Sequence, residues 1–121
     1  MDIIADYKYQ LQVANTIANT DTTFVMADCT RWVQIAVETS ATYKAGTLTV
    51  YFKPYGLSTY LPYYSGGSLV TIDLASPKAL ILQDFAISGI KLVVSGTGSD
   101  SGKTFNASVT SIADNAKNYK L

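Results

Sequence analysis

Apolar and polar side chains alternate along several short stretches of the chain. Residues 7–13 read Tyr-Lys-Tyr-Gln-Leu-Gln-Val, and in residues 47–53 Leu48, Val50 and Phe52 alternate with more polar neighbours. A period of two puts successive side chains on opposite faces of a β-strand. The pattern predicts strands with one buried face, and it places Tyr7, Tyr9, Leu11 and Val13 inward in the first of them.

The same signal recurs along the rest of the chain. Val33, Ile35 and Val37 alternate with polar residues, and further strands are expected at 22–26, 69–74, 90–95 and 104–112. Residues 79–83 fit either a strand or one helical turn, and the Asn- and Thr-rich segment 13–21 favours a loop. About eight short strands, divided by Gly, Pro and Asn, predict an all-β fold. We expect a single-domain antiparallel β-sandwich, jelly-roll or a related Greek key, with Trp32 and Tyr43 in its core.

The stretch Gly102-Lys-Thr104 raises the question of a phosphate-binding P-loop, which requires G-x-x-x-x-G-K-[ST] between a strand and a helix. Thr97 occupies the position of the first glycine, and Gly96 and Gly98 only flank it. The residues after Thr104 alternate in polarity and include Thr and Val, which favour a strand over a first helical turn. The motif is therefore interpreted as a hairpin loop between two strands.

Length and composition fit one globular domain. The chain has 121 residues, of which 48% are hydrophobic, and we assign residues 1–121 to a single domain with a polar C-terminal tail at 114–121. No apolar run is long enough to cross a membrane, and the start of the chain lacks the pattern of a signal peptide. We therefore expect synthesis and folding in a cytoplasm.

Charge is sparse and balanced. Nine acidic and nine basic residues cancel, and charged residues make up only 15% of the chain. The absence of a basic run argues against nucleic acid as a partner. A polar surface dominated by Ser, Thr, Asn and Tyr is easily desolvated, which suits a chain that packs against neighbouring proteins.

The types of residue present in the chain exclude most catalytic mechanisms. The chain contains no His and one cysteine, Cys29, so His-based triads, an intramolecular disulfide and the commonest zinc ligand are excluded. Cys29 is expected to be a half-buried strand residue. The aspartates show no ligand-like spacing. We predict no catalytic residues, no metal and no cofactor, and hence a protein that is not an enzyme.

One segment breaks the alternation and concentrates aromatic residues. Tyr55, Tyr60, Tyr63 and Tyr64 crowd a Pro- and Gly-bounded stretch between two strands. Loop tyrosines offer a large amphipathic area at small entropic cost, so the four are a candidate interface for a protein or for stacked sugar rings. The alternative is that two or three of them plug the end of the sandwich. Residues 51–64 contain no Asp, Asn, Gln or Glu, which weakens sugar recognition.

Two longer segments carry a resemblance to a family. The stretch GGSLVTIDLASPKALILQDFAISGIKLVVSGTGSDSGKTFNASVTS, together with TRWVQIAVETSATYKAGTLTVYFKP, resembles the strands and turns of small β-sandwich (jelly-roll-like) proteins that decorate bacteriophage capsids or build other parts of virions. The resemblance covers about residues 31–111 as a pattern, without a signature motif or a functional residue.

The resemblance implies a non-catalytic virion subunit, made in the host cytoplasm, that cements a capsid by protein–protein contacts. Its partners would be its own copies, with a homotrimer favoured, and a larger protein shell. Two alternatives remain: a carbohydrate- or receptor-binding β-sandwich module, and a tail or neck component of the virion.

Overall fold

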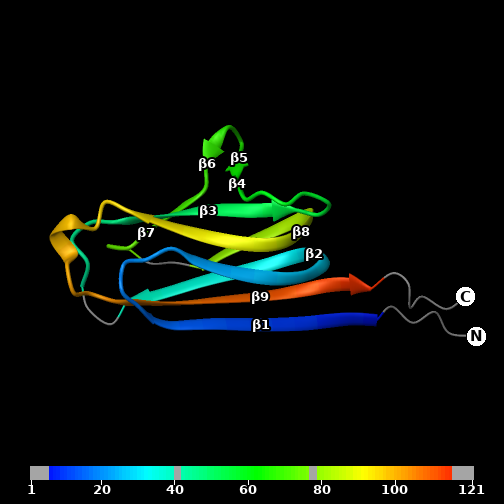
Figure 1. Ribbon diagram of the computed structural model, residues 1–121, viewed down its shortest axis with the longest axis horizontal. Helices are drawn as coiled ribbons and strands as arrows, with labels where there is room; N and C mark the ends of the chain where they lie inside the picture. Colours follow the sequence, from blue (N-terminus) through cyan, green and yellow to red (C-terminus); the bar gives the residue numbers. More distant parts are fainter. Residues whose placement is uncertain (1–5, 40–41, 77–78, 116–121) are drawn as a thin grey trace, which may run out of the picture.

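The computed structural model describes residues 6–39, 42–76 and 79–115, and within them only the backbone of 6–9, 27–31, 79–86 and 112–115. These residues form nine strands and one 3-10 turn at Gly98–Asp100 (Figure 1). The strands are β1 Asp6–Ile17, β2 Thr22–Thr39, β3 Thr47–Pro54, β4 Leu61–Pro62, β5 Tyr64–Ser65, β6 Ser68–Leu69, β7 Thr71–Asp73, β8 Ala79–Ser95 and β9 Phe105–Asn115. The all-β prediction is confirmed.

Seven strands form one antiparallel sheet in the order β1-β9-β2-β8-β3-β4, with β7 also paired to β3. The strand β9, which follows all the others along the chain, lies between β1 and β2. The short strands β5 and β6 pair only with each other and form a separate hairpin. Every pairing is antiparallel, but the four pairings from β1 to β3 in this order join strands that are not consecutive along the chain.

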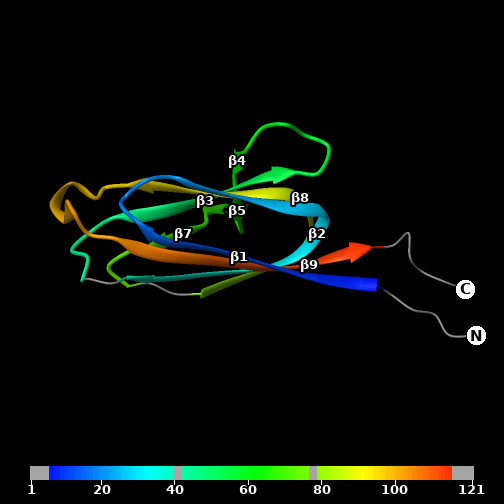
Figure 2. The same ribbon diagram turned by 60° about the horizontal axis from the view of Figure 1, so that its bottom comes forward.

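The sheet folds over on itself because two of its strands are long and change register midway. In the first half of β2, Phe24 pairs with Ile90 of β8, and in the second half Ile35 pairs with Leu80. The register between these strands shifts twice between residues 25 and 32, where β-bulges let strands bend. The two strands therefore run through both layers of a sandwich (Figure 2).

Each layer has its own additional strands. The strand β3 pairs with the second half of β8, whereas β9 pairs with the second half of β2 and holds β1 on its other side. The predicted antiparallel β-sandwich is confirmed.

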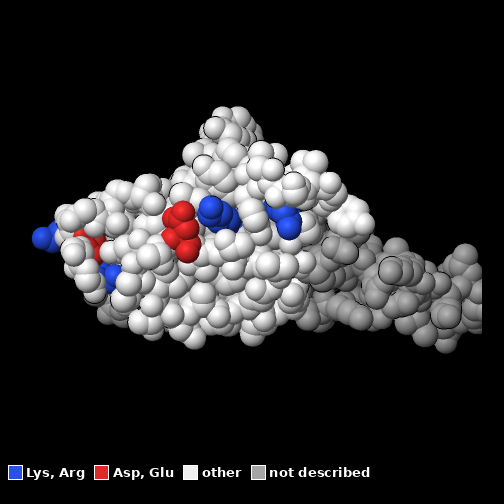
Figure 3. Space-filling model, in the orientation of Figure 1, with Lys and Arg blue, Asp and Glu red and all other residues white. Residues whose placement is uncertain are grey.

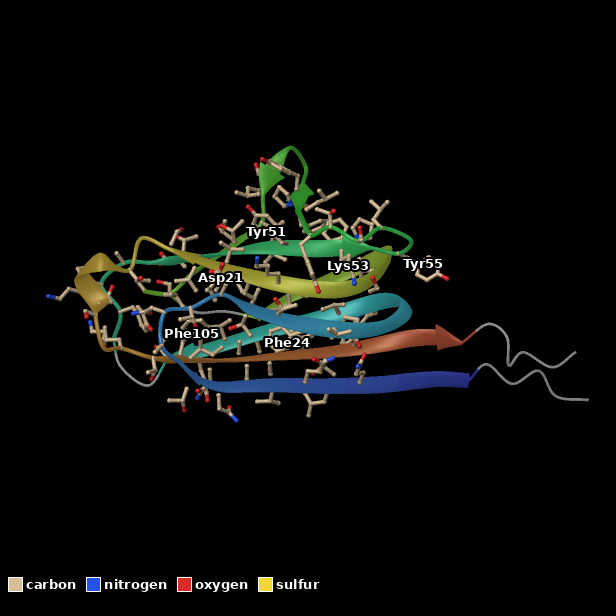
Figure 4. The ribbon with its side chains drawn as sticks, viewed as in Figure 1. Asp21, Phe24, Tyr51, Lys53, Tyr55 and Phe105 are labelled. Atoms are coloured by element: carbon tan, nitrogen blue, oxygen red, sulfur yellow. The ribbon has the colours of Figure 1, made fainter. Side chains whose placement is uncertain are left out.

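The core lies between the layers and follows the period of two. In β9, Phe105, Ala107 and Val109 are buried while the residues between them are partly exposed, and β2 repeats this with Val33, Ile35 and Val37. The eleven largest side chains that are less than 2% exposed are Phe105, Ile35, Leu48, Ile72, Leu74, Ile87, Ile90, Leu92, Val33, Val50 and Val109. Figure 4 shows Phe24 and Phe105 among the ribbons of this core. Tyr43, at 2% exposure, joins the core as predicted.

The predicted orientation of β1 is wrong where its side chains are described. Leu11 and Val13 are 65% and 53% exposed. The side-chain amides of Gln10 and Gln12 instead turn inward and donate hydrogen bonds to the carbonyl of Val25 in the other layer. At Gln10 and Gln12 the inner side of this edge strand faces a backbone carbonyl, so the polar face of β1 is the one that is covered there, and further along the same face Ala14 packs against the core.

Three further expectations need correction. Trp32 is only partly buried, because it alternates with Val33 and so lies on the outer face of β2. The segment 13–21 is not all loop, since β1 continues to Ile17, and residues 114 and 115 belong to β9 rather than to a tail. Residues 79–83 are strand, within β8. The predictions for the side chains of Cys29, Tyr7 and Tyr9, and for tail residues 116–121, fall outside the described parts.

Candidate interaction surface

The segment between β3 and β7 carries several exposed large side chains, which we together call the hairpin patch. Its members are Tyr55 (54% exposed), Leu57 (54%), Leu61 (42%), Tyr64 (59%) and Leu69 (40%). Side chains of this size are usually withdrawn from water, and a cluster of them on the surface of a soluble domain marks a contact site. The β5–β6 hairpin raises part of the patch above the sheet (Figure 1).

The base of the hairpin is fixed to β3 by backbone hydrogen bonds. The Val50 amide donates to the Val70 carbonyl (3.0 Å), and the Tyr63 amide donates to the Val50 carbonyl (2.9 Å). The Val70 amide donates to the Tyr63 carbonyl (2.9 Å) and closes the hairpin. Gly66 and Gly67 form its tip with positive φ angles of 61° and 84°, which glycine adopts without steric penalty. A hairpin held in this way presents Tyr64 and Leu69, paired across its two strands, in a defined place.

The structure separates the four predicted tyrosines into two pairs. Tyr55 and Tyr64 are exposed, and Figure 4 shows Tyr55 pointing away from the end of β3. Tyr63 is partly buried and packs edge-to-face on Phe52, with 5.1 Å between ring centroids and 73° between ring planes. Tyr60 is also partly buried, and its hydroxyl lies against Gly89 of β8. Tyr60 and Tyr63 therefore pack on the sheet, whereas Tyr55 and Tyr64 face solvent. The role of the exposed pair as an interface stays a prediction.

Burial raises the pKa of Tyr60 above its ordinary value of 10.0. The Nζ atom of Lys53 lies 5.8 Å from the centre of the Tyr60 ring, within the range of a cation–π contact. At neutral pH the Tyr60 hydroxyl is thus protonated and remains a hydrogen-bond donor beside the patch.

The patch has almost no charge around it. Residues 54–72 contain no acidic or basic residue, which makes this the longest uncharged stretch of the chain. Figure 3 shows the projecting hairpin as white throughout, with charged side chains only lower on the same face. Desolvating such a surface needs no burial of a charge, so apolar contact area converts into binding free energy without that penalty.

A second surface lies at the opposite edge of the sheet. The outer faces of β1, β9 and the end of β2 enclose a hollow of about 430 Å³, which we call the β1 hollow. It is lined by Val13, Asn15, Ala36, Val37, Glu38, Asn106, Ala107 and Ser108.

Asn106 organises the rim of the β1 hollow. Its side-chain amide donates to Glu38 (3.2 Å), and its Oδ1 atom accepts from the Thr16 amide (2.6 Å). Thr16 lies in the bulge of β1 and has a positive φ of 57°. The sequence analysis missed the hollow because it assumed that Val13 was buried.

The Gly-Lys-Thr stretch lies in the loop between β8 and β9. The predicted loop between two strands is confirmed, but the predicted hairpin is wrong, because β2 lies between β8 and β9 in the sheet. The buried Asp100 carboxylate accepts hydrogen bonds from the Lys44 amide (2.8 Å) and the Ala45 amide (3.0 Å). The Nζ atom of Lys103 lies 2.7 Å from Asp100 Oδ1 and also donates to the Thr42 carbonyl (2.6 Å). The lysine that a P-loop would offer to a phosphate is therefore already occupied by a carboxylate of its own loop.

Asn19 ties a third loop into this polar cluster. Its amide donates to the Asp100 carbonyl (3.1 Å), and its Oδ1 atom accepts from the Tyr43 hydroxyl (2.8 Å). The hydrogen bond from Lys103, helped by those from Lys44 and Ala45, lowers the pKa of Asp100 from 3.8 to about 2. Asp100 is thus ionised at neutral pH and stabilises the end of the sandwich. Sequence reasoning noted Asp100 only as a loop residue, because nothing local marks a carboxylate whose amide donors are 55 and 56 residues away.

Other kinds of site find no support in the described residues. They contain no group of three or more His, Cys, Asp or Glu side chains placed to hold a metal ion. Within the same ranges no helix has the length and apolar character needed to span a membrane.

Comparison with known proteins supports the fold. No family model matches the chain, and no curated protein sequence matches it either. Among solved structures, the SPBc2 prophage-derived protein YomS is similar over 93% of this chain and 100% of its own, with a TM-score of 0.61 and 9% sequence identity. The resemblance to β-sandwich proteins of phage origin is thereby confirmed at the level of the fold.

Two other structures are similar over most of this chain but superpose less well. A protein of the disulfide-linked pili that form Bacillus endospore appendages has a TM-score of 0.48 at 12% identity, covering 94% of this chain and 91% of its own. A mitogen derived from Yersinia pseudotuberculosis has a TM-score of 0.46 at 10% identity, covering 93% and 89% respectively.

Proposed function

We propose that this protein is a non-catalytic structural subunit of a bacteriophage particle, which decorates and stabilises the capsid by binding a larger protein shell. The observation that carries the proposal is the hairpin patch: five exposed large side chains on a projecting, uncharged segment. Tyrosine anchors surrounded by smaller apolar contacts are typical of the centre of a protein interface. The fold shared with a prophage-derived protein supports the phage context.

The mode of action in this proposal is burial of complementary surface repeated by symmetry. The subunit would be made in the host cytoplasm, assemble with its own copies and then seat on the shell of the virion. Contacts of modest strength add up when several copies bind one repeating lattice, because each further contact becomes intramolecular. A trimer, with about three times the 13.0 kDa chain mass, is the favoured assembly.

The test is cosedimentation with empty shells assembled from the major capsid protein of the same phage. We expect the parent chain to saturate the shells, and the double variant Tyr55→Ser with Tyr64→Ser to bind at least tenfold more weakly. The matched control is Val25→Ser, an aliphatic residue that is 64% exposed but lies outside the hairpin patch. Saturable binding that the double variant leaves unchanged would contradict the role of the patch.

The same proteins distinguish the carbohydrate-binding alternative. A glycan array probed with the parent chain and the double variant should show no saturable binding if the surface serves a protein interface. Glycan binding that depends on Tyr55 and Tyr64, together with no affinity for shells, would replace the capsid role with sugar recognition.

A further inference from the structure

The two longest uncharged stretches of the chain form opposite edges of the molecule. Residues 54–72 build β4 and the β5–β6 hairpin, and residues 9–20 build most of β1 and the turn after it. In the sheet order, β1 and β4 stand at the two ends, and Figure 1 shows β1 at the bottom and the hairpin at the top. Each copy thus carries two different surfaces built on uncharged segments at opposite edges, and Glu38 of β2 is the one charged residue that lines the β1 hollow.

The two surfaces differ in shape in a complementary way. The hairpin projects from the sheet and carries the cross-strand pair of Tyr64 and Leu69 on its two strands, below the tip at Gly66 and Gly67, whereas the β1 hollow is concave. A volume of about 430 Å³ is at the lower end of the range found for pockets that enclose small ligands, which is roughly 300–1,000 Å³. It suits two adjacent large side chains on a hairpin, such as Tyr64 and Leu69, better than a whole strand or helix.

The chemistry of the two surfaces also matches. Val13 and Ala36 give the β1 hollow apolar walls, and Glu38 supplies one carboxylate on its rim. A tyrosine side chain brings both an apolar ring and a hydroxyl donor, which a carboxylate accepts. The hairpin brings no carboxylate or ammonium group that would have to be desolvated.

We propose that the hairpin patch of one copy docks into the β1 hollow of the next copy, so that the chain associates head to tail. This inference rests on the proposed function, because it names a second copy of the chain as the occupant of the β1 hollow and a partner of the hairpin patch. The net charge of zero favours a copy of the same chain, since like molecules then approach without electrostatic repulsion. A contact between two different surfaces repeats from copy to copy and closes into a ring when its rotation allows.

A mixing experiment tests this geometry. Tyr64→Asp removes the hairpin side of the contact, and Val13→Asp removes the hollow side; both residues are more than half exposed. Val25→Asp is the matched control, because this valine is similarly exposed outside both surfaces. Should Val13→Asp unfold, Asn15→Arg on the exposed rim of the β1 hollow replaces it. Each protein is measured by sedimentation equilibrium over a wide concentration range, after its melting curve has shown that it folds.

We expect the parent and Val25→Asp to form the same assembly, and each single variant to associate at least tenfold more weakly. A 1:1 mixture of Tyr64→Asp and Val13→Asp retains one intact pair of surfaces, and it should give a species of twice the chain mass and nothing larger. A parent that stays monomeric, a single variant that assembles like the parent, or a mixture that stays monomeric overturns the head-to-tail contact.

The mixing experiment and the shell assay fail independently. A monomeric parent that still saturates phage shells would overturn self-association and leave the shell-binding role in place. A parent that forms the head-to-tail assembly but shows no affinity for shells would do the reverse.

Discussion

Two connections between strands differ in which side chains they bury. One is the segment between β3 and β7, residues 55–70, and the other is the loop between β8 and β9, residues 96–104. The first is rich in Tyr and Leu and exposes several of them. The second is built from Gly, Ser, Thr, Asp and Lys, yet it buries Asp100 completely.

The difference lies in what each segment has to satisfy. The loop at 96–104 meets backbone amides of residues 44 and 45 that need acceptors, so a polar side chain is drawn inward. The backbone of the segment at 55–70 forms hydrogen bonds within the hairpin and with β3. Its side chains therefore do not have to turn inward as hydrogen-bond acceptors, and they can face solvent. Polarity in the sequence therefore predicts neither burial nor exposure in these two connections.

Removing the Asp100 carboxylate should have the largest effect on the polar loop. In Asp100→Ala the amides of Lys44 and Ala45 lose their acceptors and Lys103 loses its partner, so we expect a melting temperature lower by roughly 10 °C. Differential scanning calorimetry measures this shift. The control is Ser99→Ala in the exposed part of the same turn, which should melt within about 2 °C of the parent. An equal shift in both variants would mean that the carboxylate contributes nothing specific.

Acid should weaken the same loop without any mutation. The pKa of Asp100 is lowered from 3.8 to about 2 in the folded protein, so the ionised carboxyl stabilises the fold fully above pH 4. This contribution is lost as the pH falls from about 4 through 2. Urea unfolding of the parent and of Asp100→Asn should give free energies whose difference shrinks over that range. A difference that stays constant from pH 5 to pH 2 would contradict the role of the ionised carboxyl.

Two neighbouring tyrosines sharpen the comparison within the apolar segment. Tyr63→Ala removes the ring that packs on Phe52 and should cost about 2 kcal/mol of unfolding free energy. Tyr64→Ala removes an exposed ring and should cost less than about 0.5 kcal/mol, while weakening association or shell binding. Urea unfolding together with sedimentation separates the two effects. If Tyr64→Ala lost more unfolding free energy than Tyr63→Ala, Tyr64 would be the packing residue and Tyr63 the contact residue.

A smaller effect than that of Tyr63→Ala is expected where the apolar segment lies on the sheet. A Cβ atom at Gly89 would stand 2.9 Å from the Cζ atom of the Tyr60 ring and still closer to its hydroxyl oxygen. Because Tyr60 is a side chain that can swing away, Gly89→Ala should cost only about 1 kcal/mol and should raise the exposure of Tyr60. Nitration of tyrosine by tetranitromethane, mapped by mass spectrometry, reports that exposure. If Tyr60 were nitrated in Gly89→Ala to the same extent as in the parent, the position of its ring would not depend on the lack of a side chain at residue 89.

The sequence predicted the features of the fold that depend on local pattern. The alternation in residues 47–53 and 104–112 correctly gave strands, because one face of each lies in a continuous apolar core. It failed for β1, where Leu11 and Val13 alternate just as regularly but face outward. Alternation shows that a strand has two unlike faces, and which face is covered depends on what lies across from it.

The candidate site was predictable only in outline. The crowding of tyrosines marked the right segment, but it did not distinguish Tyr63, which packs on Phe52, from Tyr64, which is exposed. That distinction depends on hydrogen bonds to Val50 and Val70, and these form only when the hairpin meets β3. The β1 hollow brings together residues from three strands far apart in the chain, so no local pattern could indicate it.

The position of β9 has a consequence for how the molecule folds. Within the described residues, β1 pairs only with β9, and this pairing joins residues about a hundred apart, such as Gln10 and Ser111. A chain emerging from the ribosome therefore carries β1 without its neighbour until nearly all of the other strands have been made. Such distant pairings fold slowly, in roughly milliseconds to seconds for all-β domains, and an unpaired strand is open to the wrong partner during that time. The interval between the synthesis of β1 and that of β9 is thus the stage at which this protein would most need a chaperone.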